Sequence, residues 1–154
     1  YILMRILGHT HSDIGITRQR TIYSLKTVLP ITIVLLIAAG LFLLLEKPRF
    51  SPTEGIVFYV CYILISCPAQ ELLFRGILSR ILQELRLHRT LELGLAAILF
   101  GYVHIIYGDM LTVVVMSIVG LFWYQAYQRS SNLIGVTISH VVLGVMTIAL
   151  GIID

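Results

Sequence analysis

The sequence predicts an all-α protein: a polytopic transmembrane helical bundle of about five spanning helices, with one amphipathic extension. Hydrophobic residues make up 58% of the 154 residues, charged residues make up 12%, and the mean hydropathy is +0.94. An average soluble domain is about half apolar and about a quarter charged. Most apolar residues lie in runs of about 20, the length that crosses a bilayer as a helix. No segment of the sequence alternates apolar and polar residues as a barrel strand does.

The beginning of the chain divides into a mixed lead-in and an apolar run. Residues 1–26 carry several arginines and histidines, and we expect them to form a cytoplasmic or interfacial lead-in. Residues 27–154 are predicted to form one transmembrane domain that begins with a spanning helix over 27–45. His9 and His11 form a His-x-His pair in the lead-in, and we expect solvated polar residues there rather than metal ligands.

The second helix follows a proline-rich polar turn. It is predicted to begin near Ser51 or Thr53, because a hydroxyl there can cap its first turn. Pro68 is predicted to kink this helix, which continues to about Arg86. Its last part is the amphipathic extension, with five apolar side chains on one side: Ile77, Leu78, Ile81, Leu82 and Leu85.

The remaining helices of the predicted bundle cover residues 91–106, 110–127 and 133–153. Three aromatic residues lie near the end of the middle one, where we expect an interfacial aromatic belt: Trp123, Tyr124 and Tyr127. The sequence starts without a methionine and ends directly after an apolar run, which leaves open that it is a piece of a longer protein.

The distribution of charge predicts the orientation in the membrane. Lysine and arginine gather in the lead-in, near the 86–89 turn and at Arg129, so these parts and the N-terminus are expected on the cytoplasmic side. The formal charge of +3 is small and no stretch is strongly basic, so a nucleic-acid partner is not expected. Cys61 and Cys67 share one helix but point in different directions, so no disulfide between them is expected. The chain is thus predicted to be a multi-pass integral membrane protein in contact with lipid.

Ionisable side chains interrupt the apolar helices. Glu71 and Arg75 lie in CPAQELLFRG, His104 ends LAAILFGYVH, and His140 lies in NLIGVTISHVVLGV. A charged side chain at the bilayer centre costs about 2.5–3.5 kcal/mol on insertion scales, so such residues are functional candidates by default. Taken singly, each has an ordinary alternative: a structural ion pair, an interfacial histidine and a buried, hydrogen-bonded histidine.

Sequence distance predicts that Glu71 and His104 lie at one depth in the membrane. Glu71 precedes His88, in the turn after the second helix, by seventeen residues, and His104 follows it by sixteen. At 1.5 Å per residue, both lie roughly 24–26 Å from that turn. We therefore expect the carboxylate and the imidazoles to meet in one polar site, with Glu71 and Arg75 forming an i,i+4 pair.

Three short segments on separate helices carry a family resemblance. They are QELLFRG, FGYVH from Phe100 to His104, and NLIGVTISH ending at His140. In order, they resemble the EExxxR, FxxxH and late-helix histidine motifs of the CPBP family. This family comprises type II CAAX prenyl proteases and the bacteriocin-processing and bacteriocin-immunity membrane proteins also called Abi. The resemblance extends over roughly residues 52–151.

The resemblance implies an intramembrane endopeptidase of the glutamate type, without a metal cofactor, that acts on a membrane-associated CAAX-type or bacteriocin-like substrate. Glu71 would be the general base, His104 would position the same water, and His140 would donate a hydrogen bond to the developing oxyanion. Three neighbours would orient substrate or water, hold the base, and pack beside the second-motif histidine: Gln70, Arg75 and Phe100.

Two positions depart from the family pattern. The first acidic position of EExxxR, usually described as activating water, is Gln70, and an amide cannot accept the proton. The position four residues after the third-motif histidine, often Asn or Asp, is Gly144. These departures favour an alternative: a catalytically impaired scaffold or a bacteriocin-immunity membrane protein with the same fold.

Two other interpretations stay open. Glu71, His104 and His140 also form a donor set that zinc accepts, although the sequence contains no HExxH motif. A small transporter or channel subunit would use Glu71 in a proton relay, but the sequence shows no inverted repeat of broken helices.

Overall fold

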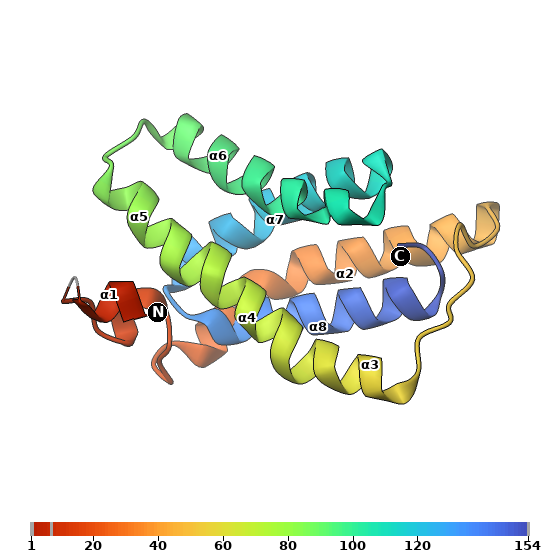
Figure 1. Ribbon diagram of the computed structural model, residues 1–154, viewed down its shortest axis with the longest axis horizontal. Coiled ribbons are helices and arrows are strands. Elements are labelled where there is room, and N and C mark those ends of the chain that lie inside the picture. The colour runs from red at the N-terminus through yellow and green to blue at the C-terminus, as the bar shows by residue number, and fades with distance from the viewer. Residues whose placement is uncertain (1, 7, 154) are drawn as a thin grey trace.

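The protein is a bundle of apolar helices (Figure 1). A computed structural model describes residues 2–6 and 8–153, and its regular elements within these ranges are all helices. In this described part of the chain, four segments are long and apolar enough to cross a membrane: α2 (Thr21–Leu45), Ile56–Glu84, Arg89–Tyr107 and α7 (Met110–Ser130). A fifth apolar helix, α8 (Leu133–Ala149), is shorter. Many of their large hydrophobic side chains face outward, as lipid contact requires, which confirms the predicted membrane bundle.

The lead-in packs against the bundle. It contains α1 (Ile2–Ile6) and a short 3₁₀ turn, η1 (Ser12–Ile14), and the side chains of Met4 and Ile14 are only 1% exposed. The Nε2 atom of His9 lies 2.8 Å from a carboxylate oxygen of Glu84, so the expectation of a merely solvated His9 is wrong. The first long helix, α2, begins at Thr21, before the predicted start at Thr27.

The second long helix is built from five pieces, two of which are π-helical. They are α3 (Ile56–Cys61), η2 (Tyr62–Ser66), α4 (Cys67–Glu71), η3 (Leu72–Ile77) and α5 (Leu78–Glu84). The predicted start at Ser51 or Thr53 is wrong: the residue before the first turn is Gly55, which makes no side-chain cap. Thr53 donates its N–H to the carboxylate of Glu54 instead, and residues 51–55 are not helical.

The π turns change which side chains face the core. Each π turn adds a residue to a helical turn and so rotates everything that follows it. Leu82 is buried, but Leu85 is 60% exposed, so the predicted apolar side of the extension is only partly correct. Pro68 lies where η2 meets α4, inside the long helix, so its missing N–H removes one hydrogen bond of that helix. Cys61 and Cys67 are both free thiols, as predicted.

Three helix starts are fixed by side chains that accept a backbone N–H, which is the usual way to satisfy a helix N-terminus. His88 caps α6 (Arg89–Tyr102), Asp109 caps α7 and Asn132 caps α8. The third long helix ends in a 3₁₀ segment, η4 (Val103–Tyr107), after which Gly108 takes a positive φ of 67° to turn the chain.

The helices α6 and α7 pack closely because glycines face the contact. A Cβ on Gly101 would overlap the hydroxyl of Ser117, and one on Gly120 would lie 2.7 Å from Cδ1 of Phe100. The three aromatic residues near the end of α7 are 1–4% exposed and belong to the core: Trp123, Tyr124 and Tyr127. The prediction of an interfacial aromatic belt is therefore wrong, because these rings turn inward.

Helices α2 and α8 lie side by side (Figure 1) and are joined by polar side chains. The hydroxyl of Ser24 donates to the carbonyl of Asn132 over 3.0 Å and accepts the N–H of Gly135 over 3.1 Å. The hydroxyls of Thr32 and Ser139 are 2.7 Å apart. Such contacts are typical of helix pairs in membranes, where apolar burial between helices gives little driving force.

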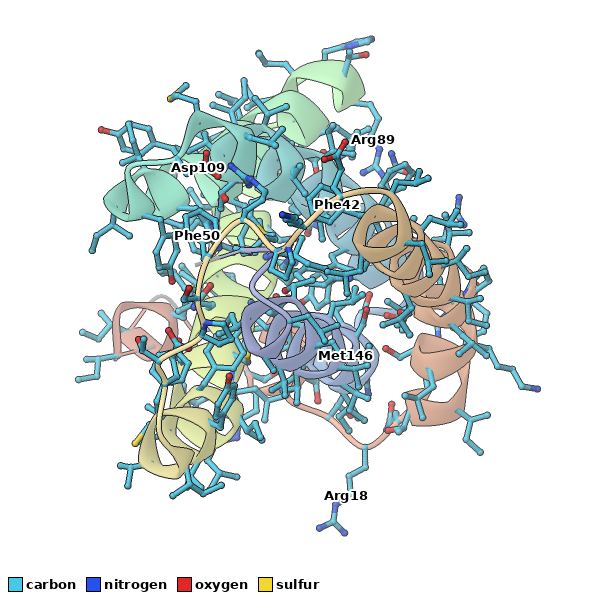
Figure 2. The ribbon with its side chains drawn as sticks, turned by 90° about the vertical axis from the view of Figure 1, so that its right-hand side faces the viewer. Arg18, Phe42, Phe50, Arg89, Asp109 and Met146 are labelled. Carbon is cyan, nitrogen blue, oxygen red and sulfur yellow. The ribbon has the colours of Figure 1, made fainter. Side chains whose placement is uncertain are left out.

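The two ends of the bundle carry different groups. At one end, Arg20 donates to the carbonyl of Arg129 over 3.0 Å. At the other end, which faces the viewer in Figure 2, Arg49 donates to the carboxylate of Asp109 over 2.8 Å. Helix α8 ends at Ala149 rather than at 153, because the chain turns back and the carbonyl of Gly151 accepts the N–H groups of residues 49 and 50. A cytoplasmic N-terminus stays a prediction.

Candidate active site

A buried ion pair lies at the centre of the second long helix. Glu71 ends α4 and is 0% exposed, and Arg75 in η3 is 1% exposed. The Nε atom of Arg75 lies 3.2 Å from Oε2 of Glu71, as the i,i+4 spacing predicts. The angles at this contact are too poor for a hydrogen bond, so Oε2 has no hydrogen-bond partner within residues 2–6 and 8–153. The charge of Arg75 thus holds the carboxylate of Glu71 in place, while Oε2 stays free to accept a hydrogen bond.

Aromatic rings hold the guanidinium of Arg75 in place. Its Cζ atom lies 3.9 Å above the ring centroid of Phe100 and 5.4 Å from that of Trp123. Its Nη2 atom donates to the carbonyl of Gly120 over 3.4 Å. A cation over a desolvated aromatic face gains about 2 kcal/mol. Phe100, at 0% exposure, therefore contributes to positioning Arg75 as well as packing near the histidines.

His140 binds the carboxylate from a different helix. Its Nδ1 atom lies 2.7 Å from Oε1 of Glu71, and because a carboxylate accepts, Nδ1–H is the donor. This assignment leaves Nε2 of the neutral ring with a free lone pair. The ring of Trp123 packs against His140 with a centroid separation of 4.7 Å. Trp123 itself donates to Ser139 over 2.9 Å, so α7 and α8 jointly fix the imidazole.

His104 is fixed by its own helix. It lies in η4, and its Nδ1 atom is 2.8 Å from the carbonyl oxygen of Phe100. Because a carbonyl oxygen only accepts, Nδ1 carries the proton and Nε2 is left as an acceptor. The rings of Phe100 and His104 meet at a centroid separation of 5.0 Å, and those of Phe100 and His140 at 5.9 Å. Phe100 thus touches both histidines.

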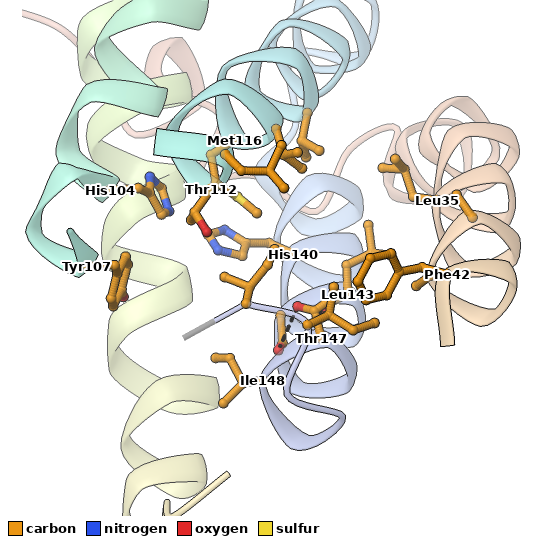
Figure 3. A pocket seen from close by; sticks show the side chains of 18 of the residues that line it. Leu35, Phe42, His104, Tyr107, Thr112, Met116, His140, Leu143, Thr147 and Ile148 are labelled. Carbon is orange, nitrogen blue, oxygen red and sulfur yellow. Dashed lines mark hydrogen bonds between the residues drawn. The ribbon is translucent and has the colours of Figure 1, made fainter. Parts of the chain in front are cut away.

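A cavity of about 230 Å³ opens beside the two histidines (Figure 3). His104 lines it from η4 and His140 from α8, together with Gln70 and Tyr62 from the second long helix. Most other lining residues are apolar, among them Leu35, Phe42, Leu111, Val115, Leu143 and Ile148. Glu71 does not line the cavity and reaches it only through His140. The cavity has room for several water molecules.

Gln70 lines the cavity and has an unused acceptor. Its Nε2 atom donates to the hydroxyl of Ser66 over 3.0 Å. Its Oε1 atom is buried, and no partner for it occurs in the described part of the chain. A buried carbonyl oxygen without a partner is uncommon and requires an explanation, such as a ligand or water.

The three sequence motifs therefore predict most residues of this site but not all of them. The structure brings Glu71, Arg75, His140 and Phe100 into contact, and His104 and Gln70 share the cavity with His140. Sequence reasoning missed the contacts of Trp123 and Tyr62 with His140. The only signal for Tyr62 was indirect: glycine at position 144, where the family often has a polar side chain.

Metal binding gains no support from the donor groups. Within residues 2–6 and 8–153, no set of three or more His, Cys, Asp or Glu side chains is arranged to hold a metal ion. In the zinc interpretation, Glu71 and His140 would point their donor atoms at a common ion, whereas here they bind each other.

Comparison with known proteins identifies the family. Residues 52–146, well over half of the chain, match the family described as "Type II CAAX prenyl endopeptidase Rce1-like". No curated protein and no solved structure gives a significant match. The matched region includes all three motifs and the polar residues of the site, but not the cavity-lining Leu35, Phe42 and Ile148. The chain therefore belongs to the Rce1-like family of type II CAAX prenyl endopeptidases within the CPBP proteins.

Proposed function

We propose that this protein is an intramembrane endopeptidase that hydrolyses a peptide bond of a membrane-associated substrate, with Glu71, His140 and His104 as its catalytic residues. One observation carries the proposal: Glu71 and His140 form a buried 2.7 Å hydrogen bond at the wall of a cavity that His104 also lines. An ionised or ionisable pair inside a membrane domain is costly, which favours a functional reason for keeping it.

The proton route follows from the hydrogen bonds. Both imidazoles use Nδ1–H in internal bonds, so both can accept from water at Nε2. Water bound between them would lose its proton to His140, while Glu71 stabilises the imidazolium that forms. His104 would orient that water. The carboxylate thus acts through His140, which refines the expectation that Glu71 takes the proton directly.

The protonated His140 then has a second use. Its new Nε2–H would donate a hydrogen bond to the oxyanion of the tetrahedral intermediate and later pass the proton to the leaving amine. Arg75 would keep Glu71 in place without occupying Oε1, the oxygen that accepts from His140, because its ion-pair contact is with Oε2.

The cavity lining supports a substrate with an apolar part. Its mostly aliphatic walls suit a lipid-modified CAAX-type peptide or a hydrophobic bacteriocin-like segment. The free carbonyl oxygen of Gln70 would accept an N–H of the substrate backbone. We also propose the orientation with the N-terminus in the cytoplasm, which the gathering of Arg20 and Arg129 at one end supports.

A second function, a non-hydrolytic scaffold or bacteriocin-immunity protein, is favoured by one feature. The side chain of the motif that faces the cavity is the amide of Gln70, while the carboxylate of Glu71 is turned away from it. A chain without a carboxylate at the cavity wall would bind a peptide and not cleave it.

Hydrolysis by the purified chain separates the two functions. The chain, reconstituted in lipid nanodiscs, would be incubated with farnesylated CAAX peptides and with a bacteriocin-type leader peptide, with a chelator present, and products read by mass spectrometry. We expect cleavage that is lost in Glu71→Gln, His104→Ala and His140→Ala and kept in the matched surface control Glu84→Gln. No cleavage by the native chain, with cleavage by Gln70→Glu, would instead support the scaffold.

A further inference from the structure

Tyr62 is a cavity residue that none of the motifs contains. It lies on the π turn η2, and its side chain lines the cavity with His104 and His140. Its ring meets the ring of His140 edge-on, with a centroid separation of 6.1 Å, and stacks on Phe58 at 5.9 Å. Single π turns inside α-helices are frequent at functional sites, because they re-aim one side chain. Here the re-aimed side chain carries a hydroxyl.

Glycine at position 144 is what makes room for this hydroxyl. A Cβ at that position would overlap Oη of Tyr62 and would lie 2.7 Å from its Cζ atom. Gly144 comes one helical turn after His140, and residues spaced i,i+4 are neighbours on a helix face at about 5–6 Å. The Tyr62 hydroxyl therefore occupies the place beside His140 that a side chain at position 144 would otherwise fill.

Peptide hydrolysis needs a hydrogen-bond donor for the oxyanion that develops beside His140. In the proposed route, Nε2 of His140 first accepts a proton, so an oxyanion that develops at the same time requires another hydrogen-bond donor. Gly144 has no side-chain donor, whereas a phenol has an O–H. An oxyanion is charged, so a hydrogen bond from this phenol to it would be stronger than one between neutral groups.

We propose that the Tyr62 hydroxyl is a catalytic hydrogen-bond donor that, together with His140, stabilises the oxyanion, taking the place of a donor from position 144. This inference rests on the proposed endopeptidase function and adds a residue to it. It also explains why the chain can have glycine at position 144, where the family often has Asn or Asp: the hydrogen-bond donor comes from the second long helix instead of from α8.

Tyr62→Phe tests the hydroxyl alone, since the ring contacts with Phe58 and His140 are kept. We expect kcat to fall about 100-fold with KM unchanged, as on loss of one oxyanion donor. The matched control is Tyr59→Phe on the same helix, which does not line the cavity and should leave kcat unchanged. An unchanged kcat in Tyr62→Phe, or a rise in KM alone, would overturn the inference.

A swap of the donor between helices provides the second test. Gly144→Asn alone should lose activity, because the new side chain overlaps Tyr62. Tyr62→Ala should lose activity through the missing donor. In the double variant the space is free and an amide N–H stands one turn after His140, so we expect at least about tenfold more activity than in Tyr62→Ala. No recovery in a folded double variant would count against a donor at this place.

Binding distinguishes failure of this inference from failure of the function. The probes are a peptide with a phosphonamidate at the scissile bond, which mimics the oxyanion, and the parent amide peptide. We expect Tyr62→Phe to weaken binding of the phosphonamidate about 100-fold and that of the amide little. If the native chain prefers the phosphonamidate and Tyr62→Phe keeps this preference, only the inference is refuted. If the native chain binds both probes alike, the endopeptidase function is refuted with it.

Discussion

His140 donates its Nδ1 proton to Glu71 over 2.7 Å, and this one hydrogen bond joins α8 to α4 at the centre of the bundle. The two residues are sixty-nine positions apart in the sequence. Glu71 is fully buried, so any effect that it has on the cavity passes through the imidazole.

Glu71 and His140 should behave as one unit in catalysis. We expect Glu71→Gln and His140→Ala each to lower kcat by at least about 100-fold and the double variant to be no worse than the more damaged single one. The reason is that each removes the same proton-accepting pair. A double-mutant cycle on kcat measures this coupling. Losses that multiply in the double variant would mean that the residues act independently.

Removal of the Arg75 guanidinium should destabilise the fold. Arg75→Met leaves the carboxylate of Glu71 buried without its cation, and breaking a buried pair costs about 3–5 kcal/mol. Arg75→Lys should recover only part of this, because an ammonium lacks the flat face that lies over Phe100. Unfolding in detergent, followed by circular dichroism, gives both values. If Arg75→Met unfolds like the native chain, the pair has no structural role.

The position of the Phe100 ring should depend on the absence of a side chain at Gly120. A methyl group there would lie 2.7 Å from Cδ1 of Phe100, so the ring would have to move. We expect Gly120→Ala to cost about 1–3 kcal/mol and to reduce activity.

Gly94→Ala is the matched control for that substitution, because no atom lies within 4 Å of a Cβ built there. Alanine favours a helix over glycine by up to about 1 kcal/mol, so Gly94→Ala should be neutral or stabilising with full activity. Equal melting temperatures for the two variants would show that the Gly120–Phe100 contact is not tight.

The Asp109 carboxylate should make stability depend on pH. A hydrogen bond from Arg49, with others from Thr112, holds the pKa of Asp109 well below its ordinary value of 3.8. A folded pKa below the unfolded one means that the stabilisation is complete well above pH 3.8 and is lost as the pH falls towards the folded pKa. The native chain should therefore melt above Asp109→Asn at about pH 7, with a difference that shrinks below pH 3.8. A difference independent of pH would assign the effect to packing.

The sequence predicts those features of the fold and the site that depend on residues close together in the chain. Apolar runs of about 20 residues gave the helices, and i,i+4 spacing gave the Glu71–Arg75 pair, because both are local properties of one helix. The motif order gave His104 and His140 as partners in one site. The bond from His140 to Glu71 depends on how α8 packs, which periodicity does not encode.

The predictions that were wrong also concern features that local sequence does not encode. The π turns at Tyr62–Ser66 and Leu72–Ile77 shift the register of the second long helix, and no residue type predicts such a turn. The aromatic residues of α7 look interfacial by position along the chain, yet they face inward, and Gly15 leaves room for the ring of Tyr127. Tyr62 reached the site through the same shift, which is why composition and spacing did not find it.

Asn132 should hold the lead-in and the start of α8 together. It is 0% exposed; its Oδ1 accepts the N–H of Ile134 over 2.8 Å, and its Nδ2 donates to the carbonyls of Thr17 and Gln19 over 2.8 Å each. A lost N-cap costs about 0.5–2 kcal/mol, and each lost hydrogen bond about 0.5–1.5 kcal/mol. We expect Asn132→Ala to lose about 2–4 kcal/mol and Asn132→Ser, which keeps a capping oxygen, to lose less.

The same substitution should reach the active site, because His140 lies eight residues after Asn132 on α8, and the start of that helix sets its register. In Asn132→Ala we expect faster trypsin cleavage after Arg18, where the lead-in has lost its anchor, together with reduced peptide hydrolysis. In Asn132→Ser the helix start is kept, so cleavage after Arg18 should rise while hydrolysis stays near the native rate. If both variants lose hydrolysis equally, the lead-in rather than the helix cap positions His140.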